Sequence, residues 1–264
     1  MDEVKLELFD THCHIQFADY QLDPAGVMSD ARGWGVSRFL AVGCALHDSQ
    51  AAIHFAQAHD NVWASIGLHP HEGARYVHDH HALQQFRDLA AKPKVVAIGE
   101  TGLDYYYKNS PKPDQQKLLK FQLDLAAEHN LPLIFHVRDA FDDFWQIFDE
   151  YQSAGQQIRG VIHSFASGTR ELDQILSRGL YVGLNGIMTF TKDQKQLDAA
   201  KKVPLDRLLL ETDAPFLTPA PFRGKIGEPK YVRTVGEFLA NLRGEDLDKL
   251  ARTTTANAIE LFRL

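Results

Sequence analysis

The sequence contains only two cysteines, Cys13 and Cys44, and no Cys-x-x-Cys pair in 264 residues. This excludes the disulfide framework of a small secreted protein and indicates a reducing compartment, so we expect a cytoplasmic location. Long apolar runs are missing too, and Met1 to Lys5 has neither the basic start nor the apolar core of a signal peptide. We therefore expect no membrane association.

An excess of positive charge is also missing, because 35 acidic residues outweigh 28 lysines and arginines and leave a formal net charge of −7. That balance excludes a general attraction of the whole surface to nucleic acid, although it leaves room for a local basic rim. No linker, low-complexity tract or internal repeat divides the chain. Its length fits either two average domains or one α/β barrel.

Short runs rich in Val, Ile, Leu and Phe alternate with amphipathic stretches such as Asp114–Asn130 and Asp139–Ala154. Such runs are typical of buried parallel strands, and the alternation predicts a parallel sheet. We expect strands near residues 5–9, 37–43, 62–67, 94–99, 132–136, 160–163, 180–183 and 207–212. Eight strands in this length favour an α/β fold with one domain over residues 1–264, a (β/α)8 TIM barrel.

The segment Asp10-Thr11-His12-Cys13-His14 ends the first apolar run. Alternate side chains of a strand share a face, so Asp10, His12 and His14 point one way and Cys13 the other. Two imidazoles one residue apart can bind one divalent metal ion, although two histidines at a strand end can equally be ordinary. Four later apolar runs also end in a possible ligand, and these are Glu100, His136, His163 and Asp213.

The barrel interpretation makes these candidates converge, because active sites of such barrels lie at the carboxyl ends of the strands. Unrelated structural side chains have little reason to select the same end. We therefore predict a joint metal site of His12, His14, Glu100, His136, His163 and Asp213. Mixed imidazole and carboxylate ligands suit Zn²⁺, Mn²⁺, Ni²⁺ or Co²⁺, and Mg²⁺ more weakly.

Seven segments, in this order and spacing, resemble the TatD family of metal-dependent hydrolases within the amidohydrolase superfamily. They are Phe9–His14 (FDTHCH), Gly67–His71 (GLHPH), Ile98–Asp104 (IGETGLD), His136–Asp139 (HVRD), His163–Gly168 (HSFASG), Glu211–Pro215 (ETDAP) and Arg223–Pro229 (RGKIGEP). The resemblance implies two divalent ions per chain. It assigns His12, His14, Glu100 and Asp213 to the first ion and Glu100, His136 and His163 to the second, with Glu100 bridging both.

Several neighbouring residues allow two interpretations. His69 either touches the substrate or orients the attacking water, or it only fixes a loop, and His71 is a weaker candidate of the same kind. Asp10 and Glu211 either support a ligand imidazole or are buried structural acids, and Asp104 either has a role near Glu100 or caps a turn. Arg138, Arg170, Arg223 and Lys225 either bind phosphate or are solvated charges. Tyr105 to Tyr107 either stack on nucleobases or pack the loop.

The resemblance implies phosphodiester hydrolysis of DNA with 3′-to-5′ polarity. We expect exonuclease-like trimming of single-stranded DNA ends, with Asp213, Glu100 and His69 as catalytic residues and His69, Arg138, Arg223 and Lys225 as substrate contacts. A site built from loops at strand ends is concave, so it admits a strand end more easily than a rigid duplex. No obligate protein partner is expected. A hydrolase of a small ester, amide or phosphoester and a non-catalytic binding or scaffolding barrel are the alternatives.

Overall fold

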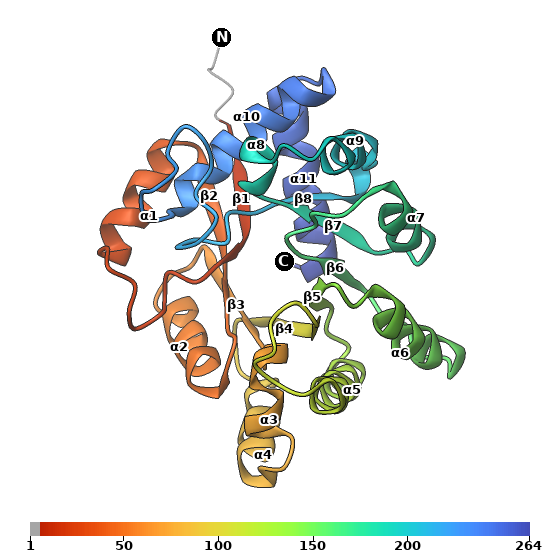
Figure 1. Cartoon of the computed structure of the whole chain (residues 1–264). Helices are drawn as coiled ribbons and strands as arrows, with labels where there is room; N and C mark the ends of the chain where they lie inside the picture. Colours follow the sequence, from red (N-terminus) through yellow and green to blue (C-terminus); the bar gives the residue numbers. More distant parts are fainter. Residues whose placement is uncertain (1–5) are drawn as a thin grey trace. The chain divides into compact units, whose positions relative to one another are not determined.

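The computed structural model describes residues 6–264, which Figure 1 colours along the chain. Its contacts form two compact units. One unit is Ala41–His163. The other contains the residues up to Leu40 together with Ser164–Leu264. Lys5, at the start of the first predicted strand, lies outside the described residues.

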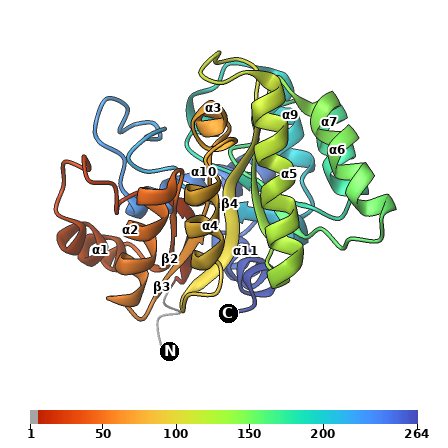
Figure 2. The same cartoon turned by 90° about the horizontal axis from the view of Figure 1, so that it is seen from below.

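The unit Ala41–His163 contains four strands that form a continuous parallel ladder from β3 to β6. Its strands are β3 (Val62–Ile66), β4 (Val95–Asp104), β5 (Leu133–Arg138) and β6 (Gly160–Ile162). Its helices are α2 (Leu46–Gln57), η1 (Pro70–Glu72), α3 (Gly73–Tyr76), α4 (His80–Leu89), α5 (Lys112–His129) and α6 (Phe141–Ser153). Helix α5 runs along β4 in Figure 2, and the two elements are in contact.

The other unit begins with β1 and ends with two long helices, α10 and α11, that pack against each other and against β1 and β8. Its strands are β1 (Leu8–Cys13), β7 (Tyr181–Leu184) and β8 (Leu208–Leu210), and β2 (Val36–Val42) begins here and ends in the first unit. Its helices are α1 (Pro24–Gly33), α7 (Thr169–Ser177), α8 (Ile187–Phe190), α9 (Gln194–Lys202), η2 (Leu205–Arg207), η3 (Pro229–Tyr231), α10 (Val232–Arg243) and α11 (Leu247–Phe262). Strands β7 and β8 are parallel.

Strand order follows chain order from β1 to β8, and helices alternate with the strands. This is the (β/α)8 fold class that the sequence predicts. All eight predicted strands are present; the bounds of six agree with the predicted ranges to within two residues, and two differ by more. Strand β1 continues to Cys13 because its end pairs with the backbone after β8, and β4 continues to Asp104 because it keeps pairing with β5.

Local sequence explains the helix next to the site. Helix α5 has a proline in its first turn, and it ends before Asn130, whose φ of 51° is left-handed. Both signals agree with the predicted helix Asp114–Asn130. The buried face includes Leu118, Leu119 and, unexpectedly for a polar side chain, Gln122. Within residues 6–264, no helix is both long and apolar enough to cross a membrane.

Candidate metal centre

Two histidines of β1 and an aspartate after β8 bring three donor atoms together. His12 Nε2 lies 3.2 Å from His14 Nε2. Asp213 Oδ1 lies 3.7 Å from the first of these nitrogens and 3.3 Å from the second. Ligand atoms at about 2.0–2.2 Å from one tetrahedral ion lie about 3.3–3.6 Å apart. The spacing of the three atoms therefore fits the coordination shell of one divalent ion.

Backbone pairing fixes this arrangement. Asp213 N donates to His12 O at 2.8 Å, and His14 N donates to Ala214 O at 2.6 Å. Between them, Cys13 and Ala214 form a parallel bridge. The Cys13 thiol lies on the other side of the strand and contacts Leu40 O at 3.5 Å. The alternation predicted for this segment is therefore confirmed, and Cys13 stays away from the donor atoms.

The buried carboxyl group of Asp10 binds β1 to the chain after β8. One oxygen accepts from Thr212 N at 2.9 Å and from His12 N at 3.3 Å, and the other lies 2.6 Å from Thr212 Oγ1. Burial raises the pKa of Asp10 to about 8. Both oxygens serve backbone and hydroxyl groups, which favours the interpretation of Asp10 as a structural acid.

Glu211 has a comparable position in the same unit. Its Oε1 accepts from Ser164 N at 2.6 Å and lies 3.4 Å from Asn185 Nδ2. Strand β7 leaves space for this carboxylate only because residue 183 is glycine, since a Cβ atom there would overlap the Glu211 side chain. These contacts hold the segments after β6 and β7 around Glu211, so a structural role fits it as well.

In the unit Ala41–His163, three imidazoles lie around one carboxylate oxygen. Glu100 Oε1 lies 2.8 Å from His136 Nδ1, 3.5 Å from His69 Nε2 and 3.6 Å from His163 Nε2. The donor atoms of His69, Glu100 and His136 are close enough to hold one ion together. Cys44 Sγ is 3.6 Å from the other oxygen, Glu100 Oε2. Glu100 is thus the centre of a second donor set.

An irregularity in β4 places Glu100. The pairing register shifts between Ile98 and Thr101, because three steps on β4 match two on β5. One extra residue of this kind is a β-bulge, which redirects a side chain. The neighbouring Gly67 is also required, since a Cβ atom there would overlap the backbone of Glu100. Sequence alone placed Glu100 at the end of a regular strand, whereas it lies inside an irregular one.

Asp104, at the end of β4, receives four hydrogen bonds in two groups. Its Oδ2 is 3.0 Å from His136 Nε2 and 3.1 Å from His71 Nε2. Its Oδ1 accepts from Tyr106 N and Tyr107 N, both at 3.0 Å. Burial raises the pKa of this carboxyl group, but the bonds from the two imidazoles and the Tyr107 amide outweigh burial and hold the pKa well below 3.8. Asp104 is therefore an ionised acceptor.

An ionised Asp104 sets the orientation of His136. His136 lies between two carboxylates, with Nε2 facing Asp104 at 3.0 Å and Nδ1 facing Glu100 at 2.8 Å. A neutral ring carries one proton, so a proton on Nε2 that is donated to Asp104 leaves the lone pair of Nδ1 available for a metal ion. Burial lowers the pKa of His136, but the bonds with Asp104 and Glu100 outweigh it and raise the pKa above 6.5. A carboxylate that holds an imidazole in this way is the usual partner of a metal-bound histidine. The sequence suggested a turn cap for Asp104, and the structure adds this contact with His136.

His69 differs from the other imidazoles in the direction of its hydrogen bonds. Its Nδ1 accepts from His71 N at 3.2 Å, so a neutral His69 carries its proton on Nε2. Burial lowers the pKa of His69 to about 4, although the Glu100 carboxylate opposes this effect. His69 is therefore neutral near pH 7 and presents an N–H donor toward Glu100. This arrangement suits a donor to substrate or water better than a metal ligand.

The predicted basic contacts lie in two places. Arg138, the last residue of β5, is exposed, and its guanidinium lies 4.0 Å from the ring centre of Tyr106. Arg223 and Lys225 lie in the long irregular segment 214–228 of the other unit. Arg223 donates to Thr218 O at 2.8 Å and lies 4.0 Å from the Phe190 ring. Each unit thus presents exposed cations, and their contact with phosphate stays a prediction.

Comparison with known proteins finds relatives that are similar over nearly the full length of this chain. A sequence model described as TatD related DNase matches residues 9–263. The uncharacterized metal-dependent hydrolase YabD of Bacillus subtilis is 38% identical over 257 residues, which cover 97% of this chain and 99% of YabD. A protein named 3′-5′ ssDNA/RNA exonuclease TatD, from Enterobacter lignolyticus, is 34% identical over 261 residues, with 97% and 98% covered.

A solved structure has the same fold over nearly the same length. It is the crystal structure of YJJV, a TatD homolog from Escherichia coli K12, with a TM-score of 0.89 and 29% identity. The alignment covers 98% of this chain and 99% of YJJV. The resemblance noted from seven short segments therefore extends over the complete fold.

Proposed function

The chain belongs to the TatD related DNase family and is a metal-dependent hydrolase acting on ester bonds, and on this premise we propose that it trims single-stranded DNA from the 3′ end. The observation that carries the proposal is the spacing of the donor atoms around Asp213 and Glu100. The relative named as an exonuclease supports the choice of substrate and the polarity.

We assign two ions to these donors. His12, His14 and Asp213 would hold one ion, and Glu100, His136 and His163 would hold the other, with Glu100 touching both as the resemblance implies. The nitrogen and carboxylate donors suit Zn²⁺, Mn²⁺, Ni²⁺ or Co²⁺, and Mg²⁺ more weakly. When bound, such ions polarise a phosphoryl oxygen and lower the pKa of a water molecule.

The chain's own groups supply proton transfer and orientation. Asp213 is the proposed proton acceptor for the attacking water, because its carboxylate adjoins two imidazoles and 14% of its side chain reaches solvent. The Nε2–H group of His69 would donate to the water or to a phosphoryl oxygen, since its Nδ1 is already occupied as an acceptor. Glu100 would keep the imidazoles of its donor set in place.

Recognition of the polyanion would come from a few cations. The net charge of −7 gives the whole surface little attraction for DNA, so Arg138, Arg223 and Lys225 are the proposed phosphate contacts. An open single-stranded end reaches a concave site more easily than a closed duplex does. The cytoplasmic location and the lack of an obligate protein partner stay predictions from the sequence.

One experiment tests this proposal. Protein reconstituted with each divalent metal is offered end-labelled single-stranded DNA, duplex DNA, RNA, circular single-stranded DNA and small phosphodiesters. A ladder that shortens from the 3′ end, with circles left intact, is the expected result. Rapid cutting of circles would contradict the end preference. Turnover of only the small phosphodiesters would move the protein to the alternative hydrolase function.

A further inference from the structure

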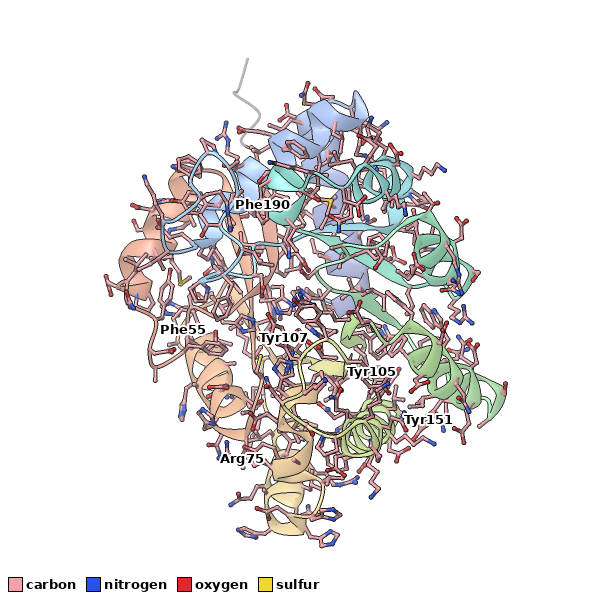
Figure 3. The ribbon with its side chains drawn as sticks, in the orientation of Figure 1. Phe55, Arg75, Tyr105, Tyr107, Tyr151 and Phe190 are labelled. Atoms are coloured by element: carbon pink, nitrogen blue, oxygen red, sulfur yellow. The ribbon has the colours of Figure 1, made fainter. Side chains whose placement is uncertain are left out.

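The loop after β4 carries three consecutive tyrosines that the proposed chemistry does not use. Figure 3 labels the first and the third, Tyr105 and Tyr107. Tyr105 packs the loop against helices α5 and α6. Its hydroxyl donates to Asp143 Oδ2 at 2.8 Å and accepts from Gln116 Nε2 at 2.9 Å. Tyr106 and Tyr107, in contrast, are 56% and 46% exposed. Packing of the loop therefore accounts for the first tyrosine and leaves two rings facing solvent.

Arg138 covers part of these two rings. Its guanidinium carbon lies 4.0 Å from the ring centre of Tyr106 and 4.9 Å from that of Tyr107. No carboxylate within residues 6–264 forms an ion pair with Arg138. The two rings are nearly perpendicular, with an angle of 85° between their planes. A guanidinium over an aromatic ring still has N–H groups that can donate to a phosphate. The two rings and this cation thus form one exposed surface with aromatic faces and a positive charge.

This surface has a fixed position beside the imidazoles. Asp104 Oδ1 holds the backbone N–H groups of Tyr106 and Tyr107, while Asp104 Oδ2 binds His136 and His71. The ring of Tyr107 also meets the ring of His71 edge to face, with centres 5.5 Å apart. A molecule that contacts the ring of Tyr107 therefore lies next to His71, which shares the Asp104 carboxylate with His136 of the donor set around Glu100.

We propose that Tyr106, Tyr107 and Arg138 form a stacking subsite for the nucleobase next to the phosphodiester that is cleaved. Tyr106 is the principal platform, because it is the more exposed ring and has the closer arginine. The inference rests on the proposed function, and it gives a physical reason why the enzyme would prefer single-stranded over duplex nucleic acid. Bases in a duplex already stack on their neighbours, whereas the bases of single-stranded DNA or RNA have faces free to stack on aromatic side chains.

The test compares intact single-stranded oligonucleotides with oligonucleotides that lack one base at successive positions from the 3′ end. For the wild-type enzyme, loss of the base at one position is expected to lower kcat/KM by about 5- to 150-fold, the range of one base–aromatic stack. Tyr106→Leu is expected to lose most of this discrimination, and the Tyr106→Leu/Tyr107→Leu double variant all of it. Tyr106→Phe keeps the ring and is the matched control that retains it.

A second measurement does not depend on turnover. A fluorescent base analogue, 2-aminopurine, is placed at the sensitive position and bound to Asp213→Asn protein, where stacking should quench its emission. Adding Tyr106→Leu to that protein should restore the emission, while Tyr106→Phe should not. Thermal unfolding and metal content, measured on each variant, separate a lost contact from a lost fold.

The outcomes distinguish the subsite from the function on which it rests. Trimming of single strands with equal rates for all base-less substrates would overturn the subsite and leave the proposed function standing. The same conclusion follows if the double leucine variant still discriminates. A wild-type enzyme that cleaves no nucleic acid would refute the proposed function and the subsite together.

Discussion

Replacement of Asp104 by asparagine tests how His136 is oriented. The carbonyl oxygen of the introduced amide can still accept from Tyr106 N and Tyr107 N, but the NH2 group would then face His136 Nε2, which now donates at 3.0 Å. An NH2 group needs an acceptor, so the proton of His136 should move to Nδ1 and point at Glu100. We expect metal affinity or turnover to fall by about 10- to 100-fold, the range for such supporting contacts.

Two measurements check this expectation. Nitrogen-15 NMR of the histidines reports which ring nitrogen of His136 carries the proton, and competition with a chelator reports metal affinity. Asp143→Asn is the matched control, because Asp143 also accepts two side-chain hydrogen bonds but from Tyr105 and Gln116 rather than from an imidazole. An Asp104→Asn protein that is folded, keeps the proton on Nε2 and binds metal normally would refute the reasoning.

Three further substitutions give separate outcomes. Glu100→Ala removes an oxygen that lies within 3.6 Å of three imidazoles and that the resemblance assigns to both ions. Both ions and nearly all hydrolysis should therefore be lost, and full metal content by elemental analysis would contradict the two-ion assignment. Asp213→Asn should lower kcat by at least about a hundredfold with a smaller change in KM, and near-normal turnover in steady-state kinetics would place the proton acceptor elsewhere. His69, with a pKa of about 4, should make the metal-free protein less stable as pH falls from 6.5 to 4, because only the unfolded chain is protonated there. The loss in the free energy of unfolding should reach about 3 kcal/mol. Denaturant titrations at several pH values measure it, and the His69→Gln variant should lack it. If the variant showed the same dependence of stability on pH as the wild type, His69 would not be the neutral group responsible.

Much of the fold could be predicted because apolar runs and helix signals are local properties of the sequence. The same runs indicated the donor residues, since His12, His14, Glu100, His136, His163 and Asp213 all lie in or just after a strand. Within each unit the structure brings these residues together. Which of them bind metal stays a proposal.

The remaining features depend on contacts between distant segments. The bulge at Glu100 depends on the register with β5, and no local pattern in Ile98–Asp104 shows that register. The role of Asp104 depends on which way the ring of His136 faces. Likewise, three adjacent tyrosines look alike in the sequence, and only the contact of Tyr105 with Asp143 separates it from the two exposed rings.

Asp104 can couple the order of the tyrosine loop to the orientation of His136. One carboxylate holds the backbone of Tyr106 and Tyr107 on one side and the imidazole on the other. If ordering that loop improves the orientation of His136, a base that orders the loop tightens metal binding. Reciprocity then requires metal binding to tighten the hold on the base by the same factor. Substrate and metal would in that case be cooperative ligands, and a partly loaded enzyme would gain metal affinity from the strand it binds.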